Sequence, residues 1–251
     1  MSHYLREEAI LLVPGHWLGA WAWNEVAAVL RVLEHRAIPV TLPGLDPQDA
    51  DRATRTLAEQ ADALIALARA ARDSSDRRVV IVGHSGANAP ISMVLDAEPD
   101  LFDRVIWVDS GPVGNGHVFA PDLAEGTIEV PLPAVEVLGQ QASLAGLDSA
   151  ALDRFARLAV PEPATILTGS VELTNDNRNG VPTTIICCSL PSAQLWELAE
   201  AQHPMFVEVL ALRDVATVDL PTGHWPMWSV PRELAMLISA ILSEENVRPS
   251  T

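Results

Sequence analysis

The nine residues VVIVGHSGA, at positions 79–87, decide the fold of this 251-residue chain. Four β-branched apolar residues come first, and a cluster of small residues around Ser85 follows them. Residues 88–96 then carry apolar side chains at helical spacing. A strand, a sharp turn and a helix around a G-x-S-x-G-like sequence form the context of a nucleophile elbow. The pattern therefore predicts that Ser85 is a catalytic nucleophile.

The small residues around Ser85 have a steric explanation. A nucleophile elbow holds its serine in a strained backbone conformation, so the residues two positions away on either side must be small. Gly83 and Ala87 meet this demand, although Ala87 stands where a second glycine is usual. The alternative interpretation is a glycine-rich turn between a strand and a helix that has no chemical role.

Short apolar runs alternate with amphipathic segments on both sides of this turn. Such alternation predicts an α/β fold, with a mostly parallel sheet of about six strands and helices on both faces. Runs that are apolar throughout are typical of strands buried on both sides. The predicted strands are residues 9–13, 38–42, 79–82, 105–108, 183–188 and 216–220. The predicted helices include residues 23–35, 56–72, 88–96, 149–158 and 232–242.

Residues 112–182 interrupt this alternation. The interval holds seven prolines and no clear strand, and its best-ordered part is the helical pattern at 149–158. A connection of this length inside an α/β domain is too long to be an idle loop. We therefore expect one α/β domain over residues 1–251, with 112–182 inserted as a cap over the catalytic ends of the strands.

Charge and composition exclude several classes of function. The net charge of −17 argues against binding to nucleic acid or to an anionic membrane surface. All 16 basic residues are arginine, so no lysine can form a Schiff base or serve a phosphate-binding Walker motif. We expect no cofactor and no metal. Residues 1–8 lack a secretory pattern and no apolar run is long enough to span a bilayer, so we expect a cytoplasmic protein.

A serine nucleophile needs a base, and His224 is the best candidate among seven histidines. It follows the last predicted strand after a short turn, from where a histidine can reach the nucleophile of a central strand. His84 directly precedes the serine and is expected to pack inside the elbow. The remaining histidines, His3, His16, His35, His117 and His203, show no comparable context for a base.

The acid that would orient His224 is less obvious. In α/β-hydrolases it lies between the serine and the histidine in chain order. The loop after the penultimate strand, residues 189–194, contains no carboxylate. Asp109 follows the strand at 105–108 and faces the same rim of the sheet, so it is the predicted acid, with a simple turn-forming role as the alternative. Three further carboxylates are weaker candidates: Asp219, Glu197 and Glu200.

Four segments together resemble blocks of the α/β-hydrolase superfamily. They are PGHWLGAWAW at 14–23, GHSGA at 83–87, VDSGP at 108–112 and LPTGHWPMW at 220–228. The chain looks most like the hydroxynitrile lyase and plant methylesterase branch and its bacterial esterase-like relatives. The first segment departs from the family pattern at Pro14, where a histidine is usual, and the acid after the penultimate strand is missing.

The resemblance implies an oxyanion hole made by the backbone N–H groups of His16 and Gly86. Two preorganised donors aimed at a developing negative charge are commonly worth several kcal/mol of activation free energy. We expect Trp17 and Trp225 to border the substrate pocket. Trp21 and Trp23 are expected to pack in the interior.

The predicted function is hydrolysis of a small, largely apolar carboxylic ester or related acyl compound by Ser85, His224 and Asp109. One alternative uses His224 as a base in lyase or cofactor-free oxygenase chemistry; hydroxynitrile lyases typically carry a lysine near the histidine, which this chain lacks. Another alternative is a non-catalytic binder of small molecules that kept the elbow. The sequence identifies neither the substrate nor the oligomeric state.

Overall fold

The computed structural model describes residues 8–72 and 78–245, so His3 and most of the N-terminal stretch lie outside the described residues. A six-stranded sheet in the order β2-β1-β3-β4-β7-β8 runs through the middle of the molecule, and all its pairings are parallel. The strands are β1 (Ala9–Val13), β2 (Arg36–Pro39), β3 (Val79–His84), β4 (Arg104–Val108), β7 (Thr183–Cys187) and β8 (Val215–Asp219). The predicted α/β class with about six mostly parallel strands is confirmed.

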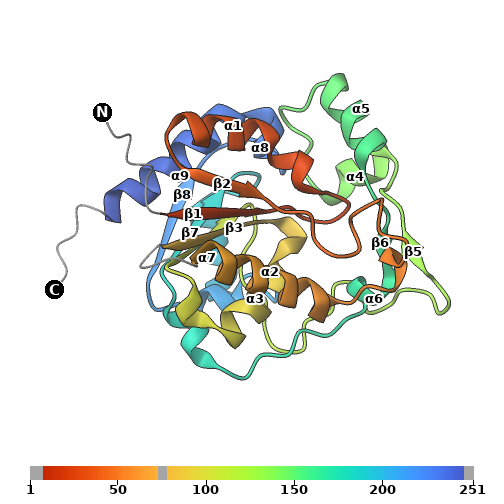
Figure 1. Cartoon of the computed structure of the whole chain (residues 1–251), viewed down its shortest axis with the longest axis horizontal. Helices are drawn as coiled ribbons and strands as arrows, with labels where there is room; N and C mark the ends of the chain where they lie inside the picture. The colour runs from red at the N-terminus through yellow and green to blue at the C-terminus, as the bar shows by residue number, and fades with distance from the viewer. Residues whose placement is uncertain (1–7, 73–77, 246–251) are drawn as a thin grey trace.

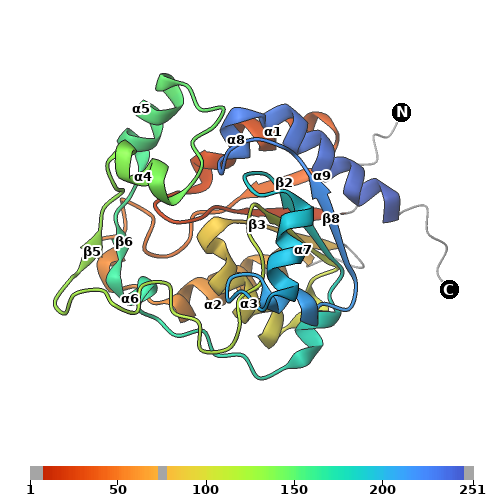
Figure 2. The ribbon, with the colours of Figure 1, turned by 180° about the vertical axis from the view of Figure 1, so that it is seen from behind.

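Helices cover both faces of this sheet, as Figures 1 and 2 show. One face carries α1 (Asn24–Val32), α8 (Pro226–Ser229) and α9 (Pro231–Glu245). The other face carries α2 (Leu57–Arg72), α3 (Asn88–Ala97) and α7 (Ser192–Glu200). Short 3-10 helices lie at Ala20–Trp23, Arg52–Thr54, Ser85–Ala87, Pro99–Leu101, Asp176–Gly180 and Val207–Ala211.

The core follows from the apolar strands. Every residue of β1, β3, β4 and β7 is buried, whereas the edge strands β2 and β8 are partly exposed. Because side chains alternate along a strand, Leu11 and Ile81 pack toward α2 and α3, while Ile10 and Val80 pack toward α1 and α9. This burial on both sides holds the carboxyl ends of the central strands in fixed positions.

Two sequence-based boundaries need correction. The strand predicted at residues 38–42 lies at Arg36–Pro39, in parallel register with Ala9–Leu12 of β1, and it ends at a proline, which has no N–H to donate to the ladder. The interval 112–182 contains two short strands, β5 (Glu129–Val130) and β6 (Glu162–Pro163), which pair antiparallel. Strands of two residues next to prolines are too short to produce a periodic signal in the sequence.

The interval 112–182 also carries α4 (Val135–Gln141), α5 (Ser149–Leu158) and α6 (Ala164–Leu167). In both ribbon views these elements gather at one end of the molecule, away from the two termini (Figures 1 and 2). Within the described ranges, no helix combines the length and the apolar character needed to cross a membrane.

Candidate active site

Ser85 lies at the carboxyl end of β3, a central strand, on the turn that leads into α3. Its φ of 51° lies in the left-handed region, which is strained for a residue other than glycine. Two glycines near Ser85 leave no room for a side chain. A Cβ on Gly83 would collide with Ile91, and a Cβ on Gly86 would collide with the His16 imidazole. The turn has the strained backbone expected of a nucleophile elbow.

His224 reaches Ser85 from the loop after β8. Its Nε2 lies 2.9 Å from Ser85 Oγ, and its Nδ1 lies 2.6 Å from Asp109 Oδ2. Two hydrogen bonds attach this loop to the 112–182 interval. The N–H of His224 donates to the Ser143 carbonyl at 2.8 Å, and the N–H of Gly223 donates to the Ala145 carbonyl at 3.1 Å. Residues of the 112–182 interval therefore set the position of this histidine.

Asp109 follows β4 and has a φ of 45°, so it too is held in the left-handed region. Its Oδ1 accepts the N–H groups of Cys188 and Ser189 at 3.0 and 2.8 Å, and its Oδ2 accepts the Ser189 hydroxyl at 2.6 Å. Burial alone would raise the pKa of Asp109, but the hydrogen bonds from His224 and Ser189 lower it to about 2. The loop after β7 thus contributes the hydrogen-bond donors that fix the carboxylate of Asp109, which follows the neighbouring strand β4.

The hydrogen bond to Asp109 determines which ring nitrogen of His224 carries the proton. An ionised Asp109 only accepts hydrogen bonds, so the close nitrogen, Nδ1 of His224, carries the proton. The neutral ring then presents a lone pair on Nε2 to the Ser85 hydroxyl. The other carboxylates considered for this role lie elsewhere: Asp219 accepts the N–H and hydroxyl of Ser192, while Glu197 and Glu200 are exposed on α7.

The remaining histidines have other surroundings. His84 is buried and donates from Nε2 to the carbonyl of His224 at 2.7 Å, and desolvation together with the charge of His224 lowers its pKa to about 3. His84 is therefore a neutral side chain that supports the His224 loop, whereas the sequence predicted only that it packs inside the elbow. His35 is buried among Glu8 and Ser239, whereas His203 is exposed.

The loop after β1 approaches the serine closely. A Cβ on Gly15 would lie 2.7 Å from the Cβ of Ser85 and 3.2 Å from the N of Gly86. Trp17, next in the loop, has a φ of 63° and is the third residue near the site in the left-handed region. The backbone N–H of His16 donates to no group in the part of the chain that the structure describes.

Glu162 is the site residue that the sequence analysis missed. Its buried carboxylate Oε1 lies 2.9 Å from His16 Nδ1 and accepts the N–H of Trp17 at 3.2 Å. The N–H of Val160 donates to the Trp17 carbonyl at 3.0 Å, and the Trp17 indole donates to the Val130 carbonyl at 3.0 Å. The loop after β1 is thus fastened to the 112–182 interval. The signal available in the sequence was a lone acid between two prolines, VPEPA at 160–164.

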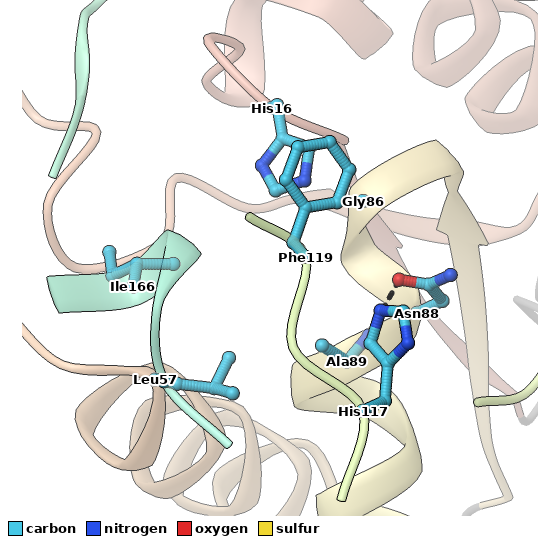
Figure 3. Close-up of a pocket in the computed structure, with 9 residues that line it drawn as sticks. His16, Leu57, Gly86, Asn88, Ala89, His117, Phe119 and Ile166 are labelled. Atoms are coloured by element: carbon cyan, nitrogen blue, oxygen red, sulfur yellow. Dashed lines mark hydrogen bonds between the residues drawn. The ribbon is translucent and has the colours of Figure 1, made fainter. Parts of the chain in front are cut away.

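A small cavity, partly open to solvent, adjoins the elbow on the side of His16 and Gly86. Figure 3 shows its lining: His16, Leu57, Gly86, Asn88, Ala89, His117, Phe119 and Ile166, together with Gly169. Neither Trp17 nor Trp225 lines it. Trp225 is 3% exposed and packs edge-on against both Phe155 and the His224 imidazole, so it is a buried residue that supports the ring of His224. Within the described ranges, no group of histidine, cysteine or acidic side chains is arranged to hold a metal ion.

A parallel sheet that presents a serine on a left-handed turn, with a histidine after its last strand, defines the α/β-hydrolase class of fold. Residues 10–237 match the model of the alpha/beta hydrolase family. The chain belongs to this family.

Several proteins of known name are similar to this chain. Methylesterase 2 of Arabidopsis thaliana is 26% identical over 62% of the chain, and the match spans only 58% of that protein's own length. A carbendazim hydrolyzing esterase of Nocardioides sp. (strain SG-4G) is 24% identical over 92% of the chain and 98% of its own length. An extracellular α/β-hydrolase from a Paenibacillus species has a similar fold, with a TM-score of 0.71 and 19% identity over 92% of this chain and 98% of that one.

Proposed function

We propose that this protein is a serine hydrolase that cleaves a small, largely apolar carboxylic ester or related acyl compound. The observation that carries the proposal is the continuous chain from Ser85 Oγ through His224 to Asp109, with contacts of 2.9 and 2.6 Å. The esterase names of its relatives in Arabidopsis and Nocardioides point to the same chemistry. The largely apolar cavity lining fits an apolar substrate.

The mechanism starts at Ser85. Its hydroxyl attacks the carbonyl carbon of the ester while His224 Nε2 takes the hydroxyl proton. Asp109 keeps the Nδ1 proton in place and stabilises the imidazolium that forms. His224 then gives the proton to the leaving alcohol, and a water molecule, activated by the same histidine, releases the acyl group from Ser85.

The negative charge on the carbonyl oxygen needs donors. We assign this role to the backbone N–H groups of His16 and Gly86, which flank the serine on two different loops. Support comes from the close approach of Gly15 to Ser85 and from the free N–H of His16 among the described residues. Pro14 precedes this pair and removes neither donor.

We further propose that residues 112–182 act as a cap on a single α/β-hydrolase domain. The interval supplies Ser143 and Ala145 behind the His224 loop and Glu162 behind His16 and Trp17. A segment with these contacts would hold both the base and the oxyanion loop while it encloses the substrate.

Replacement of the nucleophile tests this mechanism. Ser85→Ala is expected to lower the turnover of short p-nitrophenyl esters by at least about 10⁴-fold, because no other group can form the acyl-enzyme. Thermal unfolding of the variant should match that of the wild type, since only one hydroxyl is removed. Undiminished turnover in a pure preparation of the variant would rule the mechanism out and favour the use of His224 as a base alone.

A further inference from the structure

His16 and Glu162 form a second histidine–carboxylate pair beside the elbow, one that the mechanism above does not use. Glu162 Oε1 lies 2.9 Å from His16 Nδ1, and both side chains are at least nine-tenths buried. The same oxygen also accepts the N–H of Trp17.

The contacts of this pair determine which nitrogen of His16 is available. Because the Glu162 carboxylate accepts hydrogen bonds, the facing nitrogen, Nδ1, is the donor. In the neutral ring Nε2 then carries a lone pair. This atom is buried and makes no hydrogen bond to any residue in the described ranges. Buried polar atoms almost always have a partner, so an acceptor in this position calls for a donor.

The position of the ring points to the source of that donor. The imidazole edge with Nε2 lies over Gly86, the residue after the proposed nucleophile, where any Cβ would collide with it. His16 and Gly86 line the same cavity, and in Figure 3 the Phe119 ring lies across the His16 imidazole. The two ring centres are 4.1 Å apart, and Phe119 is 51% exposed, so an exposed apolar side chain covers the imidazole.

We infer that His16 determines substrate specificity: its Nε2 accepts a hydrogen bond from a hydroxyl group on the acyl part of the ester, one or two carbons from the carbonyl. The short reach follows from the contact with Gly86, which is a proposed donor to the carbonyl oxygen. Access of this group to Nε2 requires displacement of the Phe119 ring, which covers the imidazole. The inference rests on the proposed function, because it names a substrate class for the same site.

Two pairs of esters test the inference. Methyl 2-hydroxyhexanoate and methyl 3-hydroxyhexanoate are each compared with their O-methyl ethers, which keep the oxygen but cannot donate. The wild type is expected to prefer at least one hydroxy ester by about tenfold in kcat/KM, the value of one net hydrogen bond. Equal kcat/KM within both pairs would overturn the inference without any variant.

Variants then assign the preference to His16. His16→Phe keeps an aromatic ring but leaves the Glu162 carboxylate buried without its partner, so the double variant His16→Phe/Glu162→Leu is measured beside it. Both should lose the roughly tenfold preference. His203→Phe, which changes an exposed histidine that does not line the cavity, should keep it.

The outcomes separate this inference from the proposed function. A preference that survives in both His16 variants, or that disappears in His203→Phe, contradicts the role of His16. Turnover of all four esters without preference also contradicts it but leaves the serine mechanism standing. If the wild type hydrolyses neither the hydroxy esters nor their ethers nor p-nitrophenyl esters, the proposed function itself fails.

Discussion

Two serine–histidine–carboxylate clusters with similar contact distances lie at opposite ends of the sheet. At the carboxyl end, His224 contacts Ser85 Oγ at 2.9 Å and Asp109 at 2.6 Å. At the amino end, His35 contacts Ser239 Oγ at 2.8 Å and Glu8 at 2.9 Å. Distances between side chains alone do not distinguish the two.

The surroundings of the clusters differ in every other respect. Ser85 stands on a left-handed turn beside a cavity, whereas Ser239 lies within the helix α9. The His224 side chain is 17% exposed and that of His35 is fully buried. In open α/β sheets ligands bind beyond the carboxyl ends of the strands. The comparison teaches that backbone strain and access to a cavity, rather than side-chain distances, distinguish the cluster we propose to be catalytic from the buried one.

The largest expected difference concerns the two acids. Asp109→Asn should lower kcat for p-nitrophenyl esters by about 10³- to 10⁴-fold, because an amide facing Nδ1 no longer fixes the tautomer that leaves Nε2 free. Glu8→Gln is the matched change in the buried cluster and should leave kcat unaltered. Steady-state kinetics of both proteins check this. Similar kcat values in Asp109→Asn and the wild type would mean that Ser85 and His224 work as a dyad.

A smaller effect is expected in the buried cluster, where a substitution should lower stability and leave activity unaltered. His35→Ala removes the imidazole partner of the buried Glu8 carboxylate but leaves its ion pair with Arg78, so we expect the free energy of unfolding to fall by about 1–3 kcal/mol. Urea denaturation measures the change, with exposed His203→Ala as the control. The folded fraction of His35→Ala should keep its kcat. A stability equal to that of the His203→Ala control would show that the buried cluster contributes little to the fold.

The two clusters also show which parts of the site the sequence could predict and which it could not. The elbow was predictable because strand, turn and helix follow one another within 20 residues, and His224 because it follows the last strand. Asp109 could be proposed from its place after β4. The N–H groups that donate hydrogen bonds to its carboxylate, however, belong to Cys188 and Ser189, which lie 79 and 80 residues further along the chain. Nothing local predicts such a contact.

The contact between His16 and Glu162 was still harder to predict from the sequence. It joins residues 146 positions apart and depends on how the proline-rich interval folds back over the loop after β1. Periodicity identifies an element, but it does not specify which irregular segment covers which loop. The same holds for Glu8, His35 and Ser239, since the contact between the last two spans 204 positions.

Covalent labelling with a fluorophosphonate, followed by peptide mass mapping, tests the central claim most directly. The probe reacts with a serine only where a base activates the hydroxyl and donors stabilise the charge on the attacked group. We predict one modification per chain, on Ser85, with Ser239 unlabelled. Labelling of Ser239, or hydrolysis of esters by a folded protein in which Ser85 stays unlabelled, would contradict the account.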